Sequence, residues 1–513
     1  MTKAKSVLII GSHPIAEDLT RQYAALNYII RHQPEMQGCD VDINDYDELC
    51  LLTSPTQEAK LAADNQAIGR LADLASRLDV ATHGGQRVRC HLLLQSRTSL
   101  RLLQEIDFCD AIRQKIDVYP FTLNDVWSRT IVLDYEPITL QTNRTAHLVV
   151  FGTGEMAEAV MINAAQIAHY PNFTREPRLR TRITVIDEHA SAECEKWIQR
   201  YKSLFDNSYY RIIKPNTEQV VSSFHQPDYL QRGTKDFVDV EWEFVEASLY
   251  DDMIREKLAL WCTDKSRQLL TIVVAHDDQE QNLDEALHFP DCVYASNIPI
   301  HVCAHYDTLI RQLSTTKPGL RPFGMLDRGY DVRMPAVQMA KRVNYIYNLC
   351  YRDNVENWTG QIRSSVEIDK EVCEAMWQNV KAVKRMSNIY NAMSVATKMR
   401  SIGLSDNEWD KFYDIPRQDI ELLAEVEHNR WSVEELILGW RPCTAEEQRM
   451  VEADISQKEE LKKRKIHYDL RPYHDLRTDA TGKPVALYDL CLCSCLPLIT
   501  KSFADEEGGE YGY

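Results

Sequence analysis

A glycine-rich turn is the stretch of this sequence best suited to bind a phosphate group. Gly152, Gly154 and Ala157 fit the pattern G-x-G-x-x-A, after the apolar run AHLVVF and at the start of the run EMAEAVMINAAQIAHY. The first glycine permits a tight turn, the second lets the backbone approach a pyrophosphate, and a helix N-terminus offers free N–H groups. The spacing therefore predicts an anion site formed by five consecutive residues, Gly152, Thr153, Gly154, Glu155 and Met156.

An acidic residue follows the turn where a ribose would lie. Asp187 ends the strand-like run TRITVID, and a carboxylate at that point typically binds ribose hydroxyls and repels a 2′-phosphate. The gap from the glycines exceeds the usual distance of about 20 residues, because PNFTREPRLR is inserted as a loop. The pattern favours NAD or another adenine nucleotide as the cofactor. A sheet of the same kind that binds no nucleotide is the alternative, and it stays open.

The same pattern occurs earlier in the chain, in the stretch SVLIIGSHPIAEDL, with one difference. His13 stands where the second glycine should be, and its Cβ and imidazole would obstruct a close backbone approach. Pro14 suits the first turn of a helix, so the helix itself is expected to form. We therefore expect a retained fold with a weakened phosphate site at the first turn.

A second group of chemically active side chains lies in the stretch DIELLAEVEHNRWSVEELILGWRP, at residues 419–442. Arginine and histidine beside aromatic faces suit a flat base with a phosphate, through stacking and charge-assisted hydrogen bonds. The predicted ligand-binding residues of this stretch are His428, Arg430, Trp431 and Trp440. The alternative is that the two tryptophans and the cluster Glu427-His428-Asn429-Arg430 only lock the fold.

The tryptophans and cysteines of this region carry two further expectations. At about 100° per helical residue, Trp440 lies about 180° from Trp431, so one of the two should be core and the other nearer a pocket mouth. Cys491, Cys493 and Cys495 could suggest a metal site. Their spacing on a helix places Cys493 away from the other two, so we expect them to pack as small hydrophobic side chains and predict no metal.

Short apolar runs that alternate with helical runs must position these groups. This alternation, from residue 6 to about 330, predicts an α/β fold with parallel, doubly wound sheets. Beyond it, apolar residues recur at spacings of three and four, as in packed helices. The predicted units are two Rossmann-like domains, a helical connector, a small and mainly helical domain and a disordered acidic tail, at residues 1–140, 141–330, 331–418, 419–500 and 501–513.

Composition narrows the class of protein. A chain of 513 residues with a net charge of −18 is unsuited to nucleic-acid binding as a main role. Its apolar runs are shorter than the ~20 residues that cross a bilayer, and SVLIIG is too short for a signal peptide. The 14 cysteines form no C-x-x-C pair and read as reduced thiols. We therefore expect a soluble, cytoplasmic protein without a membrane span.

The second α/β segment resembles the nucleotide-binding domains of potassium-transport regulators of the Trk and RCK type (TrkA-N). The resemblance lies in VVFGTGEMAEAV, in Asp187 of VIDEH and in VVAHDDQEQNLDEAL. In such domains the AHDD stretch and the following Asn lie against the nucleotide, which implies binding or structural roles for His276, Asp277 and Asn282. The usual Gly-Asp after the third strand is missing here, where EASLYDD stands instead.

The segment from about 420 to 500 resembles the ryanodine-receptor repeat (RyR) domain of bacterial proteins. The resemblance lies in EHNRW, in GW nine residues later, in IHYDLRPYHDL and in the YD…LP-L stretch near the end. It implies a small nucleotide-binding or interaction module that is not a known catalyst. It also implies that the two halves of the module fold back on each other, which adds His467, Asp469 and Tyr473 to the predicted ligand-binding residues. Helices such as those in NYIYN and SNIYNA precede this domain in bacterial fusions with nucleotide-binding domains.

Taken together, these patterns favour a cytosolic, non-catalytic nucleotide sensor. It would regulate a separately encoded channel, transporter or effector, and analogy with bacterial fusions suggests ion transport or phage-defence signalling. Two alternatives stay open, an NAD-dependent oxidoreductase and an assembly scaffold. Against the oxidoreductase, we recognise no acid–base pair suited to catalysis beside the strand ends. Regulators of the Trk type pair through such domains, so we also expect a homo-oligomer.

Overall fold

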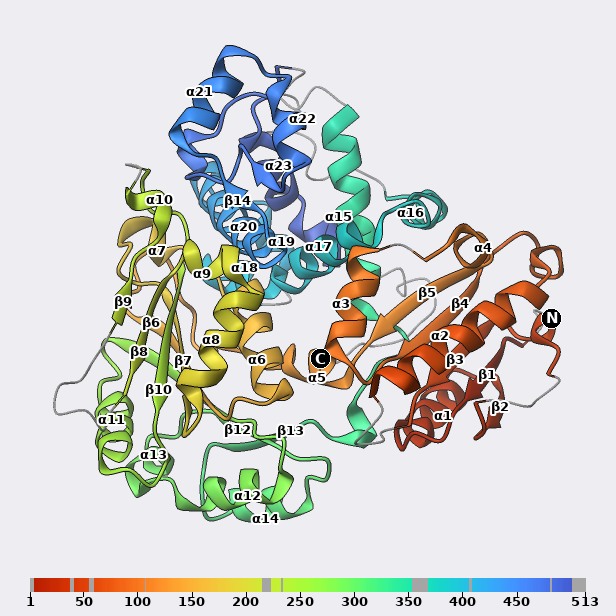
Figure 1. Ribbon diagram of the computed structural model, residues 1–513, viewed down its shortest axis with the longest axis horizontal. Helices are drawn as coiled ribbons and strands as arrows, with labels where there is room; N and C mark the ends of the chain where they lie inside the picture. Colours follow the sequence, from red (N-terminus) through yellow and green to blue (C-terminus); the bar gives the residue numbers. More distant parts are fainter. Residues whose placement is uncertain are drawn as a thin grey trace.

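The computed structural model describes residues 4–36, 41–54, 60–106, 108–214, 223–231, 234–352, 368–405, 408–479 and 482–500. In this part of the chain two parallel-stranded sheet units are followed by a body of helices (Figure 1). The predicted α/β class with parallel sheets is thereby confirmed. The acidic tail predicted at residues 501–513 lies outside the described residues.

The first sheet has five parallel strands in the order β2-β1-β3-β4-β5. Its strands are β1 (Ser6–Ile10), β2 (Ile29–Gln33), β3 (Glu48–Leu52), β4 (Val88–Leu93) and β5 (Ile116–Phe121). Its helices are α1 (Ile15–Ala25), α2 (Lys60–Arg77), α3 (Arg97–Glu105), α4 (Asp110–Arg113) and α5 (Leu123–Ser128). The order reverses at β1, so the first glycine turn lies at the point where ligands bind in doubly wound sheets.

The second sheet has eight strands in the order β13-β12-β11-β6-β7-β10-β8-β9. They are β6 (Thr145–Phe151), β7 (Thr181–Asp187), β8 (Tyr209–Ile213), β9 (Ser223–His225), β10 (Val240–Glu246), β11 (Gln268–Val274), β12 (Ile300–Cys303) and β13 (Leu320–Phe323). All pairs are parallel except β8 with β9. Without β8 and β9, the order is the 3-2-1-4-5-6 arrangement of doubly wound dinucleotide-binding sheets.

The helices of the second unit cover both faces of its sheet. They are α6 (Glu155–Ile167), α7 (Asn172–Arg175), α8 (Ala190–Arg200), α9 (Lys202–Asp206), α10 (Asp228–Gln231), α11 (Asp252–Thr263), α12 (Gln279–His288), α13 (Asp291–Ala295) and α14 (Thr308–Ser314). Strand β6 is buried along its whole length, as expected for a central strand covered on both faces. The expected pattern of apolar strand, glycine turn and helix is therefore present in both units.

The carboxyl ends of the two sheets face each other. Lys60, which follows β3, lies 2.8 Å from the Glu155 carboxylate, which follows β6. Arg97, which follows β4, lies 3.3 Å from the carboxylate of Glu158 in α6. Figure 1 shows α3, α5 and α6 between the two sheets. Both glycine turns therefore lie on the sides of the units that face each other.

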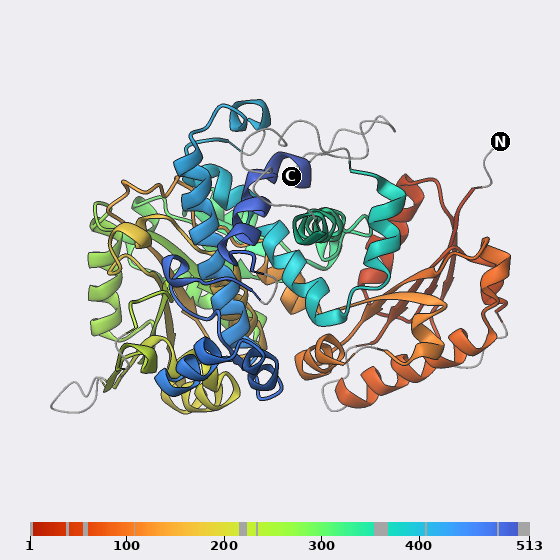
Figure 2. The same cartoon turned by 90° about the horizontal axis from the view of Figure 1, so that it is seen from above.

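The C-terminal helices extend from one sheet unit towards the other (Figure 2). They are α15 (Pro335–Arg352), α16 (Lys370–Trp377), α17 (Ala382–Met393), α18 (Val395–Ser401), α19 (Trp409–Phe412), α20 (Arg417–Ile437), α21 (Ala445–Ala453), α22 (Gln457–Lys462), α23 (Ala486–Ser494) and α24 (Leu496–Thr500). A short parallel pair joins β14 (Arg441–Pro442) to β15 (Ile466–His467). One apolar core contains residues of α15, α17, α20 and α23, so it spans the boundary predicted at residue 418. None of the helices in the described ranges has the length and apolar character needed to cross a membrane.

Candidate nucleotide site and the C-terminal polar cluster

The turn after β6 has the tight geometry that its first glycine predicts. Gly152 has a φ of 111°, a backbone conformation that residues with a Cβ rarely adopt. A Cβ at this position would lie 2.9 Å from both the Ala275 carbonyl oxygen and the His276 amide nitrogen. The backbone of β6 therefore turns against the end of β11, at the point where the strand order of the sheet reverses.

Gly154 lies against a carboxylate. It is the N-cap of α6 and makes no side-chain cap. A Cβ built on Gly154 would overlap the carboxylate of Asp277, so this acid lies directly beside the N-terminus of α6. A helix N-terminus attracts anions, and here Asp277 supplies one from within the chain. A bound phosphate would have to share the position with Asp277 or displace its side chain.

Asp187 and His276 lie next to each other at the same sheet edge. His276 Nδ1 is 3.8 Å from Asp187 Oδ2, and His276 Nε2 is 3.0 Å from Glu285 Oε2 in α12. Asp187 also accepts a hydrogen bond of 2.8 Å from the His189 amide. The structure therefore brings Asp187, His276 and Asp277 to the glycine turn, as the sequence predicts.

Asn282 holds the loop rather than facing outward. Its side chain is completely buried, its Oδ1 accepts from the His276 amide at 2.7 Å, and its Nδ2 donates to the carbonyl oxygens of His276 and Cys303. Of the two roles that the resemblance implies for this residue, the contacts favour the structural one.

The other residues of the turn contribute in different ways. Met156 is buried in the core of the second unit, and Glu155 forms a partly exposed ion pair with Lys60. Thr153 is half-buried. Among the described residues, no acceptor is assigned to the amides of Glu155, Met156 and Ala157, the first three of α6. These three N–H groups are the donors that the turn can offer to a phosphate.

The histidine of the first glycine turn is buried. His13 is 4% exposed and its Nδ1 accepts a hydrogen bond from the Ile15 amide. Burial, together with the nearby His305 of the second unit, lowers the pKa of His13 to about 4. His13 is therefore a neutral side chain packed at the junction of the two units.

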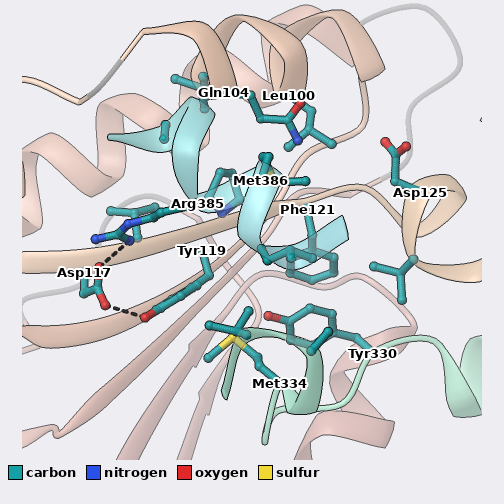
Figure 3. Close-up of a pocket in the computed structure, with 18 of the residues that line it drawn as sticks. Leu100, Gln104, Asp117, Tyr119, Phe121, Asp125, Tyr330, Met334, Arg385 and Met386 are labelled. Atoms are coloured by element: carbon teal, nitrogen blue, oxygen red, sulfur yellow. Dashed lines mark hydrogen bonds and ion pairs between the residues drawn. The ribbon is translucent and has the colours of Figure 1, made fainter. Parts of the chain in front are cut away.

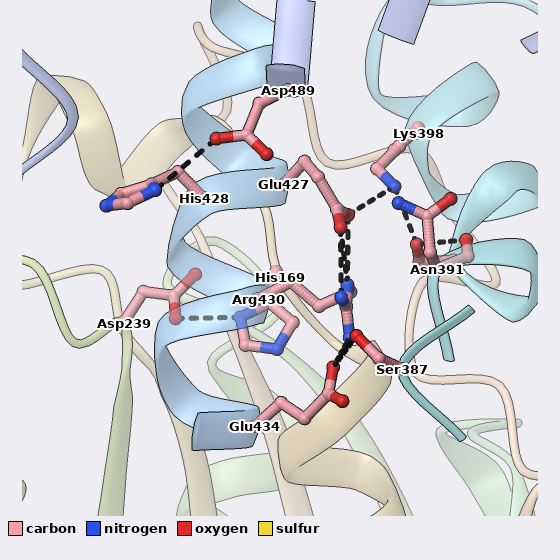
Figure 4. Close-up of polar contacts among 11 residues, drawn as sticks. His169, Asp239, Ser387, Asn391, Lys398, Glu427, His428, Arg430, Glu434 and Asp489 are labelled. Atoms are coloured by element: carbon pink, nitrogen blue, oxygen red, sulfur yellow. Dashed lines mark hydrogen bonds and ion pairs between the residues drawn. The ribbon is translucent and has the colours of Figure 1, made fainter. Parts of the chain in front are cut away.

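The C-terminal cluster is a buried network of charges (Figure 4). Arg430 is 1% exposed. Its Nε and Nη2 donate to the Glu427 carboxylate at 2.9–3.0 Å, and its Nη1 donates to Glu434 at 2.7 Å. Lys398 adds a second cation, 2.7 Å from Glu427. Burial acts to raise the pKa of Glu427, but Arg430 and Lys398 outweigh it and lower the pKa to about 2.

The network favours the structural alternative for Arg430. All three nitrogens of the guanidinium donate to carboxylates of its own helix, and Glu434 also accepts from Ser387 of α17 at 3.3 Å. The network therefore joins α20 to α17 and α18. Binding a phosphate would require these contacts to break inside a buried site, which is costly.

The aromatic residues of the predicted ligand site do come together. Trp431 lies between His428 and His467, with ring centroids 5.5 and 4.9 Å away, and Trp440 lies 5.6 Å from His467. Tyr473 lies 5.9 Å from His428. Burial lowers the pKa of His467 to about 4, so this ring is neutral at pH 7.

The polar partners of this aromatic group are also within the protein. His428 Nε2 donates to the Arg471 carbonyl oxygen at 2.8 Å, and its Nδ1 lies 3.4 Å from Asp489. Asp469 forms an ion pair of 3.1 Å with Lys458. Six of the seven predicted residues therefore lie in one group that contains His428 and His467. Arg430 belongs to the separate charge network.

The two tryptophans differ from the expectation that one is core and the other is not. Both are half-buried. The reason is that α20 ends at Ile437, so the helical angle does not extend to Trp440. Gly439 has a φ of 85°, and its backbone N–H donates to the Leu436 carbonyl oxygen. The backbone N–H of Trp440 donates to the Glu435 carbonyl oxygen. This is the Schellman pattern, which reverses the chain and returns Trp440 towards His467.

The three closely spaced cysteines are all buried in the apolar core of the helical body. Among the residues that the structure describes, no group of histidine, cysteine and acidic side chains is arranged to hold a metal ion.

Comparisons with known proteins identify no relative. No protein-family model matches the chain, and neither the curated proteins nor the solved structures gave a match.

One exposed aromatic residue at the sheet edge was not predicted. Tyr250 follows β10, the strand beside β7, and is 51% exposed. Its hydroxyl donates to Asp284 of α12 at 2.5 Å, which links the segment after β10 to α12. The sequence signal is an aromatic residue directly after a strand end, in EASLYDD.

Proposed function

We propose that this protein is a non-catalytic regulator that binds an adenine nucleotide at the glycine turn of the second sheet unit. The observation that carries the proposal is the position of the turn. Gly152 and Gly154 stand between β6 and α6, at the reversal of a 3-2-1-4-5-6 strand order. That is the point where sheets of this order bind nucleotides.

The neighbouring residues suit the other parts of a nucleotide. Asp187, at the end of β7, can accept hydrogen bonds from ribose hydroxyls and disfavours a 2′-phosphate. Tyr250 offers an exposed ring at the end of the next strand, and a ring of this kind can stack on a base. NAD therefore fits the edge better than NADP.

Acidic side chains near the phosphate position disfavour ligands that carry more negative charge. Asp277 beside Gly154 and Glu155 on α6 both carry negative charge near the amides that would hold the phosphates. A dinucleotide with two phosphate charges suits this position better than a triphosphate. At about 4 Å in water, each repulsion between unit charges costs about 1 kcal/mol, roughly fivefold in affinity.

A regulatory role is supported by what surrounds the turn. The turn lies where the two sheet units face each other, and α6 also contacts α20 of the helical body. A ligand there can change how the three parts pack. The effector is a separately encoded protein in this proposal, and the resemblances to Trk-type and RyR domains suggest ion transport or stress signalling as the setting.

Calorimetry with the full-length protein tests the proposal. Wild type should bind NAD, and NADP more weakly. Gly154→His should abolish binding while circular dichroism stays unchanged, and His13→Gly, at the matching position of the first unit, should change affinity little. Asp277→Asn should tighten binding about fivefold. Unchanged NAD binding in Gly154→His would disprove the site, and steady consumption of NAD by the pure protein would disprove the non-catalytic role.

A further inference from the structure

A large cavity of the described chain lies away from both glycine turns. Its volume is about 460 Å³, within the roughly 300–1,000 Å³ of small-molecule sites. One wall is the edge strand β5 with α3 and α5 of the first unit, and the other is formed by α15, α16 and α17. Junctions between domains are preferred places for such sites.

The lining is mainly apolar and adaptable (Figure 3). Phe121 and Tyr330 stack with their ring centroids 3.9 Å apart, and Leu100 and Met386 face them in the view. Three methionines, Met334, Met386 and Met393, line the cavity, and methionine adjusts its shape to different apolar ligands.

The polar groups at one end satisfy each other. Asp117 accepts from Arg385 at 2.7 Å and from the Tyr119 hydroxyl at 2.5 Å. Arg385 also donates to the carbonyl oxygens of Trp377 and Val380. This end therefore closes the cavity without leaving a charge to be matched by a ligand.

At the other end, one buried polar atom has no hydrogen-bond partner. Arg129 Nε is buried and has no acceptor, and among the described residues no carboxylate lies within ion-pair distance of Arg129. Its Nη2 makes a long contact of 3.5 Å with the Tyr390 hydroxyl, its guanidinium carbon lies 5.3 Å from the Tyr390 ring centroid, and the nearby Asp125 is paired with Arg97. Gln104, which is half-buried, lines the same cavity and offers an amide. Gln104 also lines a small adjoining cavity together with Tyr390, the residue that Arg129 contacts.

A buried donor without an acceptor is costly in a folded protein, and a charged one more so. An occupant that supplies a carboxylate to Arg129 and an apolar body to the rest of the cavity would remove this cost. We propose that the cavity is a binding site for an apolar, aromatic-type carboxylate, with Arg129 and Gln104 holding the carboxylate and the methionine-lined wall holding the ring system.

The test uses full-length protein and a matched pair of probes, 2-naphthoate and naphthalene, which share an apolar body and differ in the carboxylate. Calorimetry should show one 2-naphthoate bound per chain, at least tenfold tighter than naphthalene. Arg129→Met should reduce 2-naphthoate affinity to that of naphthalene. Val380→Trp, which fills the cavity, should weaken both probes at least tenfold.

Ala396→Leu is the control for the cavity-filling variant, because Ala396 lines a neighbouring cavity of about 370 Å³ and not this one. It should leave both affinities unchanged, with circular dichroism confirming the fold of every variant. Equal affinity of the two probes for wild type, absence of 2-naphthoate binding, or full binding by Val380→Trp would each overturn the proposal. None of these outcomes depends on nucleotide binding at the glycine turn.

Discussion

Removing the guanidinium of Arg430 should destabilise the helical body strongly. In Arg430→Met the carboxylate of Glu434 keeps only the 3.3 Å contact from Ser387, and Glu427 keeps only Lys398. Removing one partner of a buried ion pair typically costs about 3–5 kcal/mol. The lowered pKa of Glu427 agrees in direction, because Arg430 and Lys398 together outweigh the effect of burial on this carboxylate. We therefore expect Arg430→Met to lower the free energy of unfolding by about 3–5 kcal/mol.

Urea unfolding followed by tryptophan fluorescence measures this loss. The matched control is Arg417→Ala on the same helix, because Arg417 and Glu421 form an exposed ion pair with side chains 59% and 50% exposed. Such a pair contributes about 0.3–0.5 kcal/mol. If Arg430→Met costs no more than this control, the buried network is not what holds the helix, and the reasoning is wrong.

A double variant and the pH dependence sharpen the test. Arg430→Met with Glu434→Gln should lose less than the sum of the single variants, because no unpaired carboxylate remains at residue 434. Because Glu427 has a lowered pKa in the folded state, its contribution is complete above pH 4.5 and is lost as the pH falls towards 2. In Arg430→Met this acid dependence should shrink, since Lys398 alone faces the carboxylate.

Three further predictions concern other buried groups. Cys493→Ser should lower the free energy of unfolding by about 1–3 kcal/mol because it buries a hydroxyl in an apolar core, and Cys493→Ala should lower it less. The reverse order in urea unfolding would indicate a polar or metal-binding role. Burial lowers the pKa of His147 to about 3, so stability should fall as the pH drops from 6.5 towards 3, by about 1.4 kcal/mol per pH unit. His147→Gln should flatten the measured slope, and an unchanged slope would contradict the assignment. Gly439→Ala should cost about 1–2 kcal/mol because of its positive φ. Gly69→Ala, inside α2 with open space around it, should instead stabilise by up to about 1 kcal/mol, and the same gain in Gly439→Ala would refute the argument.

Local patterns were enough to predict the class of the fold. Runs such as SVLII and TAHLVVF are apolar on both faces, and they form the fully buried strands β1 and β6. The order of the strands could not be predicted in the same way. The first sheet follows 2-1-3-4-5 and the second contains 3-2-1-4-5-6, although both begin with the same local pattern. Strand order depends on long-range pairing, which no local pattern records.

The candidate site was predictable only where its residues follow strand ends. Asp187 and His276 meet the glycine turn because the carboxyl ends of neighbouring parallel strands share one edge. The buried pairing of Arg430 was not foreseen as the deciding contact, because Lys398 and Ser387 reach it from other helices. The cavity beside β5 is formed by residues from 100 to 393, and no local spacing could have indicated it.

Two physical reasons can require a glycine at residue 154, where the first turn has His13: packing against Asp277 and the admission of a phosphate. One experiment distinguishes them. Even without a ligand, any side chain at residue 154 would meet the Asp277 carboxylate, which would have to move aside. His13 meets no such carboxylate and fills the junction with the second unit near His305. If Gly154 serves only this packing, Gly154→Ala combined with Asp277→Ala should restore stability and bind NAD no worse than Asp277→Ala alone. If it also admits a phosphate, the double variant should be stable and still lose NAD affinity, because the added Cβ keeps the pyrophosphate from the backbone of α6.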